Sequence, residues 1–291
     1  MSAKKLISLH DAGSHHWVGD GFPVRNFFPS TGLETEVSPF LMLDYAGPTD
    51  FKPTEKPRGV GEHPHRGFET VTIAYQGSVD HRDSGGNKGT IFPGDVQWMT
   101  AGSGIVHEEM HEKEFAHNGG TFEMVQLWVN LPRVHKMTEP KYQALISKDI
   151  PQVRLDGDDS FARVIGGTFN GVTGPASTFS PVTLLDVRLA AGTRTSVKLE
   201  AGHNVVIFIL SGSLQIAGRE VSNAPKLALL DTQGDEIELV ARDASKLLIM
   251  SGQPIDEPIA SYGPFVMNTK EELMTAIQDY QTGKMGHLSA V

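Results

Sequence analysis

The chain has 291 residues, of which 39% are hydrophobic and 21% charged, a composition typical of a protein with a packed core rather than of a disordered one. The 35 Asp and Glu outnumber the 25 Lys and Arg and give a formal net charge of −10, which argues against nucleic-acid binding by charge alone. Cysteine is absent, so disulfides and thiolate metal sites are excluded, and any metal must be held by imidazole or carboxylate groups.

No targeting or membrane segment is evident. The apolar stretch LISL near the N-terminus is too short for the core of a signal peptide, and no run of about 18 apolar residues occurs. We therefore expect a cytoplasmic protein that makes no contact with a membrane.

Short apolar runs bounded by Gly, Pro, Asp or Asn recur along the chain and predict β-strands. Many short strands separated by turn signals are typical of a β-sandwich or barrel. A helix is predicted only near the C-terminus, where Thr269 and Glu272 form a capping box and Leu273, Ile277 and Tyr280 share one face. The predicted strands cover residues 40–46, 70–77, 90–95, 124–131, 182–190, 204–212, 227–231 and 246–252.

A weak internal repeat relates the two halves of the chain. A strand that ends in a glycine turn, AYQGSVD in the first half and FILSGSLQI in the second, sets the alignment. The repeat predicts two domains, an N-terminal one over residues 1–140 and a C-terminal one over residues 141–291 that ends in the helix. Residues 134–151 are the expected connection. The alignment places Lys198, Glu200, Leu247 and Ile249 where the first half has His63, His65, His107 and Glu109.

Two motifs of the first half indicate a metal site. His63 and His65 stand at i and i+2 in HPH, so on a strand both side chains project to one face, roughly 6.5–7 Å apart. His107 and Glu109 repeat this spacing in HEE. Two such pairs on facing strands would enclose one ion with three imidazoles and one carboxylate. Glu69 shares the parity of His63 and His65 and is a competing ligand.

The donor types leave the metal open. Imidazole and carboxylate groups suit Fe, Mn, Ni, Cu or Zn alike. Four protein ligands would leave two open positions on an octahedral ion, as a catalytic metal requires. Of the remaining histidines, His111 is expected to be an ordinary loop residue, and His81 stands alone and is a weaker candidate. Glu108 should face away from His107 and Glu109.

The stretches HPHRGFETVTI, GDVQWMTAGSGIVHEEM, QLWVNLP, EPKYQ and GPFVMNTKEE resemble, in order, the signature segments of the pirin family of the cupin superfamily. This resemblance implies an all-β bicupin, with two antiparallel jelly-roll barrels, a short C-terminal helix, and a metal in the N-terminal barrel alone. The family's ligands correspond to His63, His65, His107 and Glu109, which favours Glu109 over Glu69. Where the family often has His-Ala-Glu, this chain has His-Glu-Glu.

The resemblance also implies a cofactor and an activity. The cofactor would be one divalent transition metal, Fe(II) in the first place, with Ni, Cu, Mn or Zn as alternatives. The activity would be that of a quercetin 2,3-dioxygenase, in which the metal holds the flavonol 3-hydroxyl oxygen and Glu109 accepts its proton as general base. Dioxygen then adds across C2 and C4, and the ring opens with loss of carbon monoxide.

The expected partners follow from this activity. They are a flavonol and O2, without direct nucleic-acid contact, and Phe68, Trp98, Met99 and Met110 are candidate walls for a flat aromatic substrate. Each of these four side chains suits a barrel core equally. The alternative function implied by the family is a non-enzymatic, iron- and redox-sensing regulator that acts through protein partners.

Overall fold

The computed structural model describes residues 2–29, 33–157 and 159–288. The chain forms two compact units, each built from segments that are distant in sequence. Unit 1 comprises Met1–Ala12, Ser30–Pro39 and Lys148–Pro254, and unit 2 comprises Gly13–Pro29, Phe40–Ser147 and Ile255–Val291. This grouping differs from a division at residue 140. The first residues of the chain belong to unit 1 together with Lys148–Pro254, and the last segment, Ile255–Val291, belongs to unit 2.

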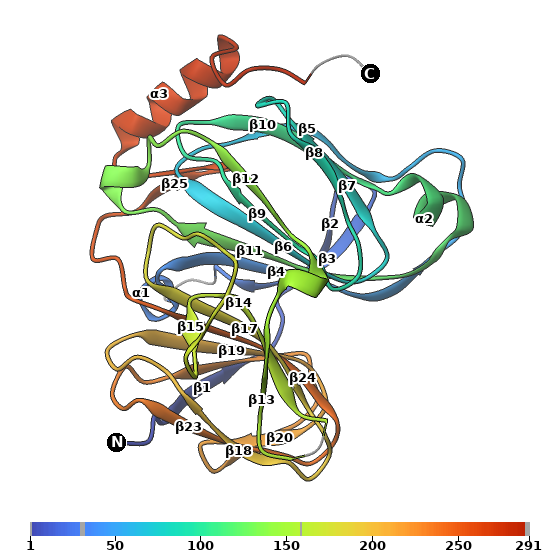
Figure 1. The fold of residues 1–291 in the computed structure, drawn as a ribbon. Helices are drawn as coiled ribbons and strands as arrows, with labels where there is room; N and C mark the ends of the chain where they lie inside the picture. Colours follow the sequence, from blue (N-terminus) through green and yellow to red (C-terminus); the bar gives the residue numbers. More distant parts are fainter. Residues whose placement is uncertain (1, 30–32, 158, 289–291) are drawn as a thin grey trace. The chain divides into compact units, whose positions relative to one another are not determined.

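Unit 2 contains two antiparallel sheets, whose strands Figure 1 labels. The seven-stranded sheet has the order β12 (Lys141–Leu145), β9 (Val96–Thr100), β6 (Phe68–Gln76), β11 (Gly120–Asn130), β4 (Phe40–Phe51), β3 (Phe22–Phe28) and β2 (His15–Val18). The four-stranded sheet has the order β5 (Gly59–His65), β10 (Ile105–His111), β7 (Val79–Asp83) and β8 (Lys88–Ile91). The shorter elements are α2 (Lys113–Asn118), the 3-10 turn Arg133–His135, and the strand pair β25 (Ala260–Tyr262) and β26 (Phe265–Met267).

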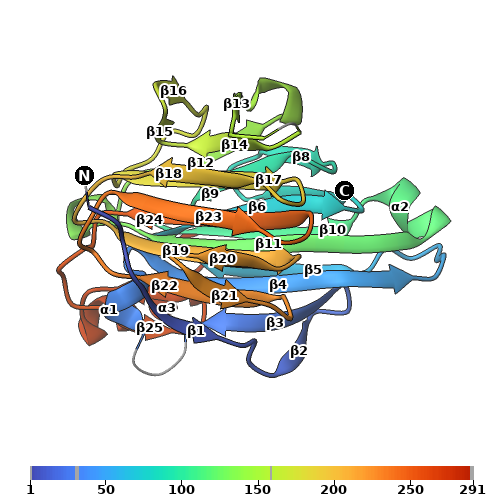
Figure 2. The ribbon, with the colours of Figure 1, turned by 90° about the horizontal axis from the view of Figure 1, so that it is seen from below.

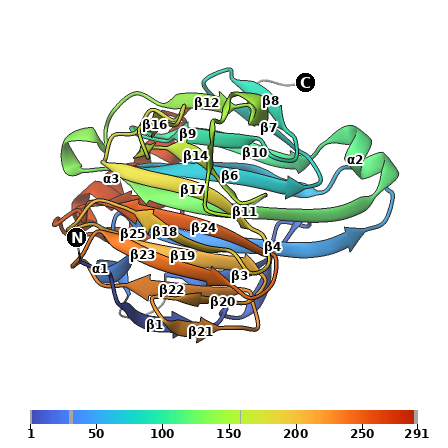
Figure 3. The same cartoon turned by 60° about the horizontal axis from the view of Figure 1, so that its bottom comes forward.

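Unit 1 repeats this plan. Figure 2 shows its four-stranded sheet as one layer, with β18 (Arg194–Lys198), β23 (Glu236–Ala241), β20 (Leu214–Ile216) and β21 (Arg219–Val221). Its seven-stranded sheet begins at an edge that can be followed in Figure 3, with β1 (Leu6–His10) beside β22 (Lys226–Leu230), and continues with β19 (Asn204–Ser211), β24 (Ser245–Gly252), β17 (Val182–Leu189), β14 (Phe161–Gly166) and β13 (Gln152–Arg154). The shorter elements are α1 (Glu34–Val37), the 3-10 turn Ser147–Asp149, β15 (Thr168–Phe169) and β16 (Val172–Thr173).

The prediction of an all-β protein with two related jelly-roll domains is confirmed. In each unit the architecture is a seven-stranded sheet and a four-stranded sheet rather than one closed barrel. All paired strands in the named sheets run antiparallel, for example β6 with β11 and β19 with β24. Residues 141–145, expected in a connection, form the edge strand β12, which pairs with β9.

The predicted C-terminal helix is α3 (Lys270–Gln281), and its first turn has the capping box in which Thr269 and Glu272 satisfy each other's backbone N–H groups. The helix belongs to unit 2, where its buried Leu273 and Ala276 pack in one hydrophobic cluster with Val106 of β10. Its apolar stripe therefore covers the outer face of the strand that carries His107. None of the helices in the described part of the chain is long and apolar enough to cross a membrane.

Strand order and burial correct the predicted alignment of the halves. β23, not β24, takes the place of β10, because it lies between β18 and β20 as β10 lies between β5 and β7. Lys198 and Glu200 are exposed. The side chains that face inward at the positions of the predicted ligands are aliphatic and pack in or against the core of unit 1: Val197, Leu199, Ile237 and Leu239.

Candidate metal centre

The four-stranded sheet of unit 2 brings three histidines together from two strands. His107 of β10 pairs directly with His63 of β5, and His65 lies opposite Ile105. The ring centroid of His107 is 4.2 Å from that of His63 and 4.8 Å from that of His65. One ring nitrogen from each of the three lies within 4.8 Å of the others, so the predicted i, i+2 geometry does bring these imidazoles together.

Glu109 lies in a second group. Its carboxylate is within 4.8 Å of ring nitrogens of His81 and His107, rather than of all three histidines above. The cause is a β-bulge: the ladder between β10 and β5 shifts after His107, so that Glu109 pairs with Val60. Glu109 also pairs with His81 of β7. His107 thus belongs to both groups, and Glu109 would have to turn toward His63 to complete the predicted set of four.

Burial keeps His65 and His107 in the neutral form that binds metals. Burial lowers the pKa of His65 and of His107 well below the ordinary value, and the neighbouring histidines lower both further. His65 Nδ1 and His107 Nε2 are buried and have no hydrogen-bond partner among the described residues. A buried ring nitrogen without a partner is costly unless something binds its lone pair. The site therefore fits a metal ion held by imidazole nitrogens.

Hydrogen bonds to the other ring nitrogens fix which lone pair each histidine offers. His63 Nδ1 donates a hydrogen bond to the Gly61 carbonyl at 2.8 Å. The lone pair of His63 is therefore on Nε2, where it can bind a metal. His111, by contrast, donates Nε2 to the Gly21 carbonyl at 2.8 Å and packs against Phe122, which is a structural role.

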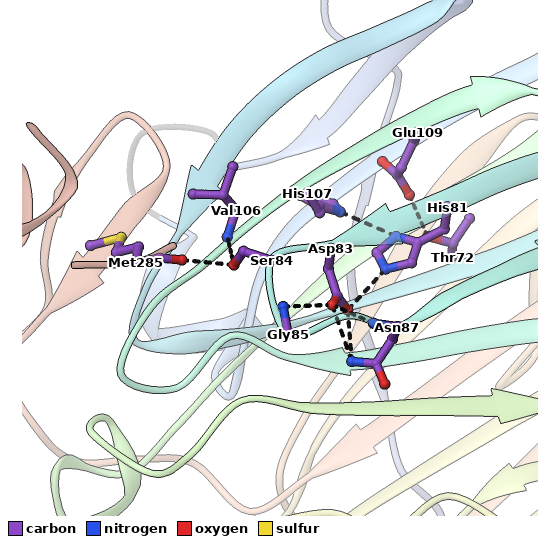
Figure 4. Close-up of polar contacts among 10 residues, drawn as sticks. All are labelled: Thr72, His81, Asp83, Ser84, Gly85, Asn87, Val106, His107, Glu109 and Met285. Atoms are coloured by element: carbon purple, nitrogen blue, oxygen red, sulfur yellow. Dashed lines mark hydrogen bonds and ion pairs between the residues drawn. The ribbon is translucent and has the colours of Figure 1, made fainter. Parts of the chain in front are cut away.

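A longer chain of contacts sets the tautomer of His107 (Figure 4). His81 Nε2 is 3.3 Å from Asp83 Oδ2, and His81 Nδ1 is 3.4 Å from His107 Nδ1. Burial alone would raise the pKa of Asp83, but hydrogen bonds from His81 and Asn87 outweigh burial and hold this pKa below the ordinary value. An ionised Asp83 requires the proton on His81 Nε2. His81 Nδ1 then accepts from His107 Nδ1, and the buried His107 Nε2 carries the lone pair.

Sequence reasoning treated His81 as a lone histidine and did not single out Asp83. The signal was present in VDHRD, because residues 81 and 83 share parity, and in the sheet they lie directly opposite Glu109 and His107 of β10. Glu69 lies outside both groups. The Thr100 hydroxyl donates to its carboxyl group at 2.7 Å, and burial raises the pKa of Glu69 to about 7. As predicted, Glu108 faces away, where it forms an ion pair with Arg82.

A cavity of about 290 Å³ opens beside the histidines, close to the lower end of the range for small-molecule pockets. His63, His65 and Glu109 line it. Its apolar wall consists mainly of side chains from β2, β3, β4 and β11: Val18, Phe22, Val24, Met42, Met124 and Trp128.

The four side chains predicted to contact a substrate are placed elsewhere. Trp98 and Met99 are fully buried, and Met110 is half-buried; none of the three lines this cavity. Phe68 is also fully buried, with its ring centroid 4.2 Å from that of Trp128 and 5.2 Å from that of His65. It supports the wall from behind and does not form its surface.

Two family models match the chain, Pirin over residues 21–129 and Pirin C-terminal cupin domain over residues 184–286. A Pseudomonas aeruginosa protein that is named, provisionally, a quercetin 2,3-dioxygenase is 51% identical over 97% of this chain and 98% of its own length. Pirin of Rattus norvegicus is 36% identical over 98% of this chain and 95% of its own. A crystal structure of quercetin 2,3-dioxygenase from Acinetobacter baumannii, 50% identical, superposes with a TM-score of 0.96 over 99% of this chain and all of the other. The chain belongs to the pirin family and has its two cupin domains.

Proposed function

We propose that this protein is a metal-dependent dioxygenase that cleaves flavonols such as quercetin, with ring opening and release of carbon monoxide. The observation that carries the proposal is the placement of His63, His65 and Glu109 on the wall of an apolar cavity in unit 2. A catalytic metal needs an open position that faces a pocket for the substrate, as these imidazoles face the apolar cavity, whereas a structural site needs no pocket. The names of the relatives from Pseudomonas aeruginosa and Acinetobacter baumannii agree with this reading.

The proposed ligands are His63, His65, His107 and Glu109, and the proposed metal is Fe(II), with Ni, Cu, Mn or Zn as alternatives. When bound, the metal would supply Lewis-acid and redox chemistry at the substrate oxygens. The apolar wall excludes water from a flat aromatic ring and orients it between the two sheets.

Glu109 is the proposed general base. Its carboxylate lines the cavity, and its Oε1 is 3.2 Å from the Thr72 hydroxyl. Thr72 Oγ1 is also 2.7 Å from Gln126 Oε1, so its single proton serves one acceptor at a time. A carboxylate held by one weak contact can turn to take the proton of the flavonol 3-hydroxyl, which then leaves that oxygen as an anion.

The test is turnover by protein loaded with Fe(II). We expect quercetin and O2 to be consumed together with release of carbon monoxide, and we expect both His63→Ala and Glu109→Gln to abolish this turnover. His117→Ala is the matched control, because that histidine is exposed and belongs to neither group of possible metal ligands, and it should react like the wild type.

The same assay separates the alternative function. Protein that binds one iron per chain but is inert toward a panel of flavonols would contradict the dioxygenase proposal. It would favour an iron- and redox-sensing role through protein partners, which we would then test by comparing partner affinity for the Fe(II), Fe(III) and metal-free forms. A cytoplasmic location stays a prediction under either function.

A further inference from the structure

A row of polar side chains crosses the inner face of the seven-stranded sheet in unit 2. Its members are direct cross-strand neighbours on five adjacent strands, and the row passes along the wall that carries the cavity. Such a row is unusual, because the inward face of a buried sheet is normally apolar. From β3 to β9 the members are Asn26, Asp44, Gln126, Thr72 and Gln97.

Unit 1 provides an internal reference for this row. Thr72 on β6 and Ile207 on β19 lie on equivalent strands, and each stands five residues before the glycine that follows its strand. The rows of side chains that pass through Thr72 and Ile207 therefore correspond. The equivalent row is aliphatic throughout and fully buried: Val164, Leu185, Ile249, Ile207 and Ala228. The fold therefore does not need polar side chains at these positions, and a different requirement must explain them in unit 2.

Asp44 and Gln126 bring this polarity to the cavity. They are direct partners on β4 and β11, so their Cβ atoms lie about 4.5–5.5 Å apart, and both line the cavity. Asn26 Nδ2 donates to Asp44 Oδ1 at 2.7 Å, and Thr72 donates to Gln126 Oε1 at 2.7 Å. Among the described residues, no hydrogen bond reaches Asp44 Oδ2 or leaves Gln126 Nε2. One acceptor and one donor therefore remain side by side on an otherwise apolar wall.

We propose that Asp44 and Gln126 form a recognition pair for a hydroxylated aromatic ligand, in which Asp44 accepts a hydrogen bond from a ring hydroxyl and Gln126 donates one to an adjacent oxygen. The inference rests on the proposed function and deepens it, because it separates these contacts from those at the metal-binding cluster. It also predicts discrimination: a site built to bond a hydroxyl group rejects an analogue that lacks it, since its buried polar atoms are then left unpaired.

The experiment compares two flavonols as anaerobic ligands of the metal-loaded protein. Quercetin carries several further ring hydroxyls in addition to the 3-hydroxyl and 4-keto groups, whereas 3-hydroxyflavone has the same ring system and these two groups but none of the further hydroxyls. We expect the wild type to bind quercetin more tightly. Asp44→Leu and Gln126→Ile place in the cavity the residues found at the equivalent positions of unit 1. Asp44→Leu should weaken quercetin binding by about 10- to 100-fold and Gln126→Ile by about tenfold, with 3-hydroxyflavone affinity changed by less than about threefold.

Asp50→Asn is the matched control, since Asp50 lies on the same strand but is exposed. Metal content is measured for every variant, and Gln126→Ile serves if Asp44→Leu does not fold. Unchanged quercetin affinity in the folded variants would overturn the inference, as would equal affinity of the wild type for both flavonols, and either result would leave the dioxygenase proposal standing. A wild type that binds neither flavonol would overturn the proposed function and this inference together.

Discussion

His81 is the residue whose replacement best tests how the metal centre is organised. In the proposed arrangement His81 is not a ligand but accepts a hydrogen bond from His107 Nδ1 and so keeps the His107 Nε2 lone pair free. His81→Leu removes that acceptor and places an aliphatic side chain where unit 1 has Ile216. The fold should therefore tolerate the change, and its effect should fall on the metal.

The size of the effect follows from the distances. Loss of a partner behind a metal ligand commonly lowers metal affinity by about 10- to 100-fold. The His81–His107 contact of 3.4 Å and the His81–Asp83 contact of 3.3 Å are longer than the 2.7–3.2 Å of good hydrogen bonds. The loss of metal affinity should therefore lie near the lower limit of that range. We expect a loss of about tenfold, or about 1.4 kcal/mol.

The assay is a competition titration with a chromophoric chelator, carried out with Co(II) because its visible absorption reports the ligand set. His81→Leu should weaken binding by about tenfold and leave the spectrum close to that of the wild type, and His117→Leu should leave both unchanged. Affinity within twofold of the wild type would refute the proposed relay. A loss above about 1,000-fold with an altered spectrum would show that His81 is itself a ligand, in the group with His107 and Glu109.

Three further predictions concern stability. Gly67 and Gly86 both have a positive φ, but a Cβ on Gly67 would lie 2.0 Å from the Val266 carbonyl oxygen, whereas one on Gly86 would meet nothing within 4 Å. Urea unfolding should therefore show a larger loss of stability for Gly67→Ala than for Gly86→Ala, and equal losses would contradict this. Burial raises the pKa of Glu69 to about 7, so between pH 4.5 and 7 the folded state holds the extra proton, and the wild type should lose about 3 kcal/mol relative to Glu69→Gln as pH rises. Burial lowers the pKa of Lys136 to about 8, so between pH 8 and 10.5 the unfolded state binds more protons than the folded state. The stability of the wild type should therefore rise by about 3 kcal/mol over this range relative to Lys136→Met. Parallel profiles of stability against pH for wild type and variant would refute either assignment.

Much of the fold could be predicted from the sequence because strand signals are local. The runs around Val71, Leu127, Leu185, Ile207 and Ile249 are apolar, short and bounded by turn residues, and each lies in a strand of the structure. The helix was predictable from its capping box and apolar stripe. The unit to which the helix belongs was not, because its packing against Val106 depends on a contact between residues more than 150 positions apart.

The metal centre was predictable in part for the same reason. Parity within one strand suffices to place His63 beside His65, and strand pairing brings His107 to both. The position of Glu109 depends on the bulge after His107, which no local pattern marks. His81 was missed because its importance lies in a contact with His107 on the neighbouring strand. The cavity wall was missed because β11 contributes Trp128 and Gln126 through register alone.

The interleaving of the two units along the chain has a consequence for biosynthesis. Unit 2 contains the candidate metal centre, yet its last segment, Ile255–Val291, follows the whole of unit 1 in sequence. A ribosome therefore releases the strands that carry His63 and His107 long before α3, whose Leu273 packs with Val106. All segments of unit 1 have been synthesised once the chain reaches Pro254, so unit 1 can complete its fold first. Until α3 is synthesised, the face of the metal-binding strands that carries Val106 stays uncovered. Unit 2 is thus the last to be completed, although the segment that carries its metal-binding strands is synthesised before the longest segment of unit 1.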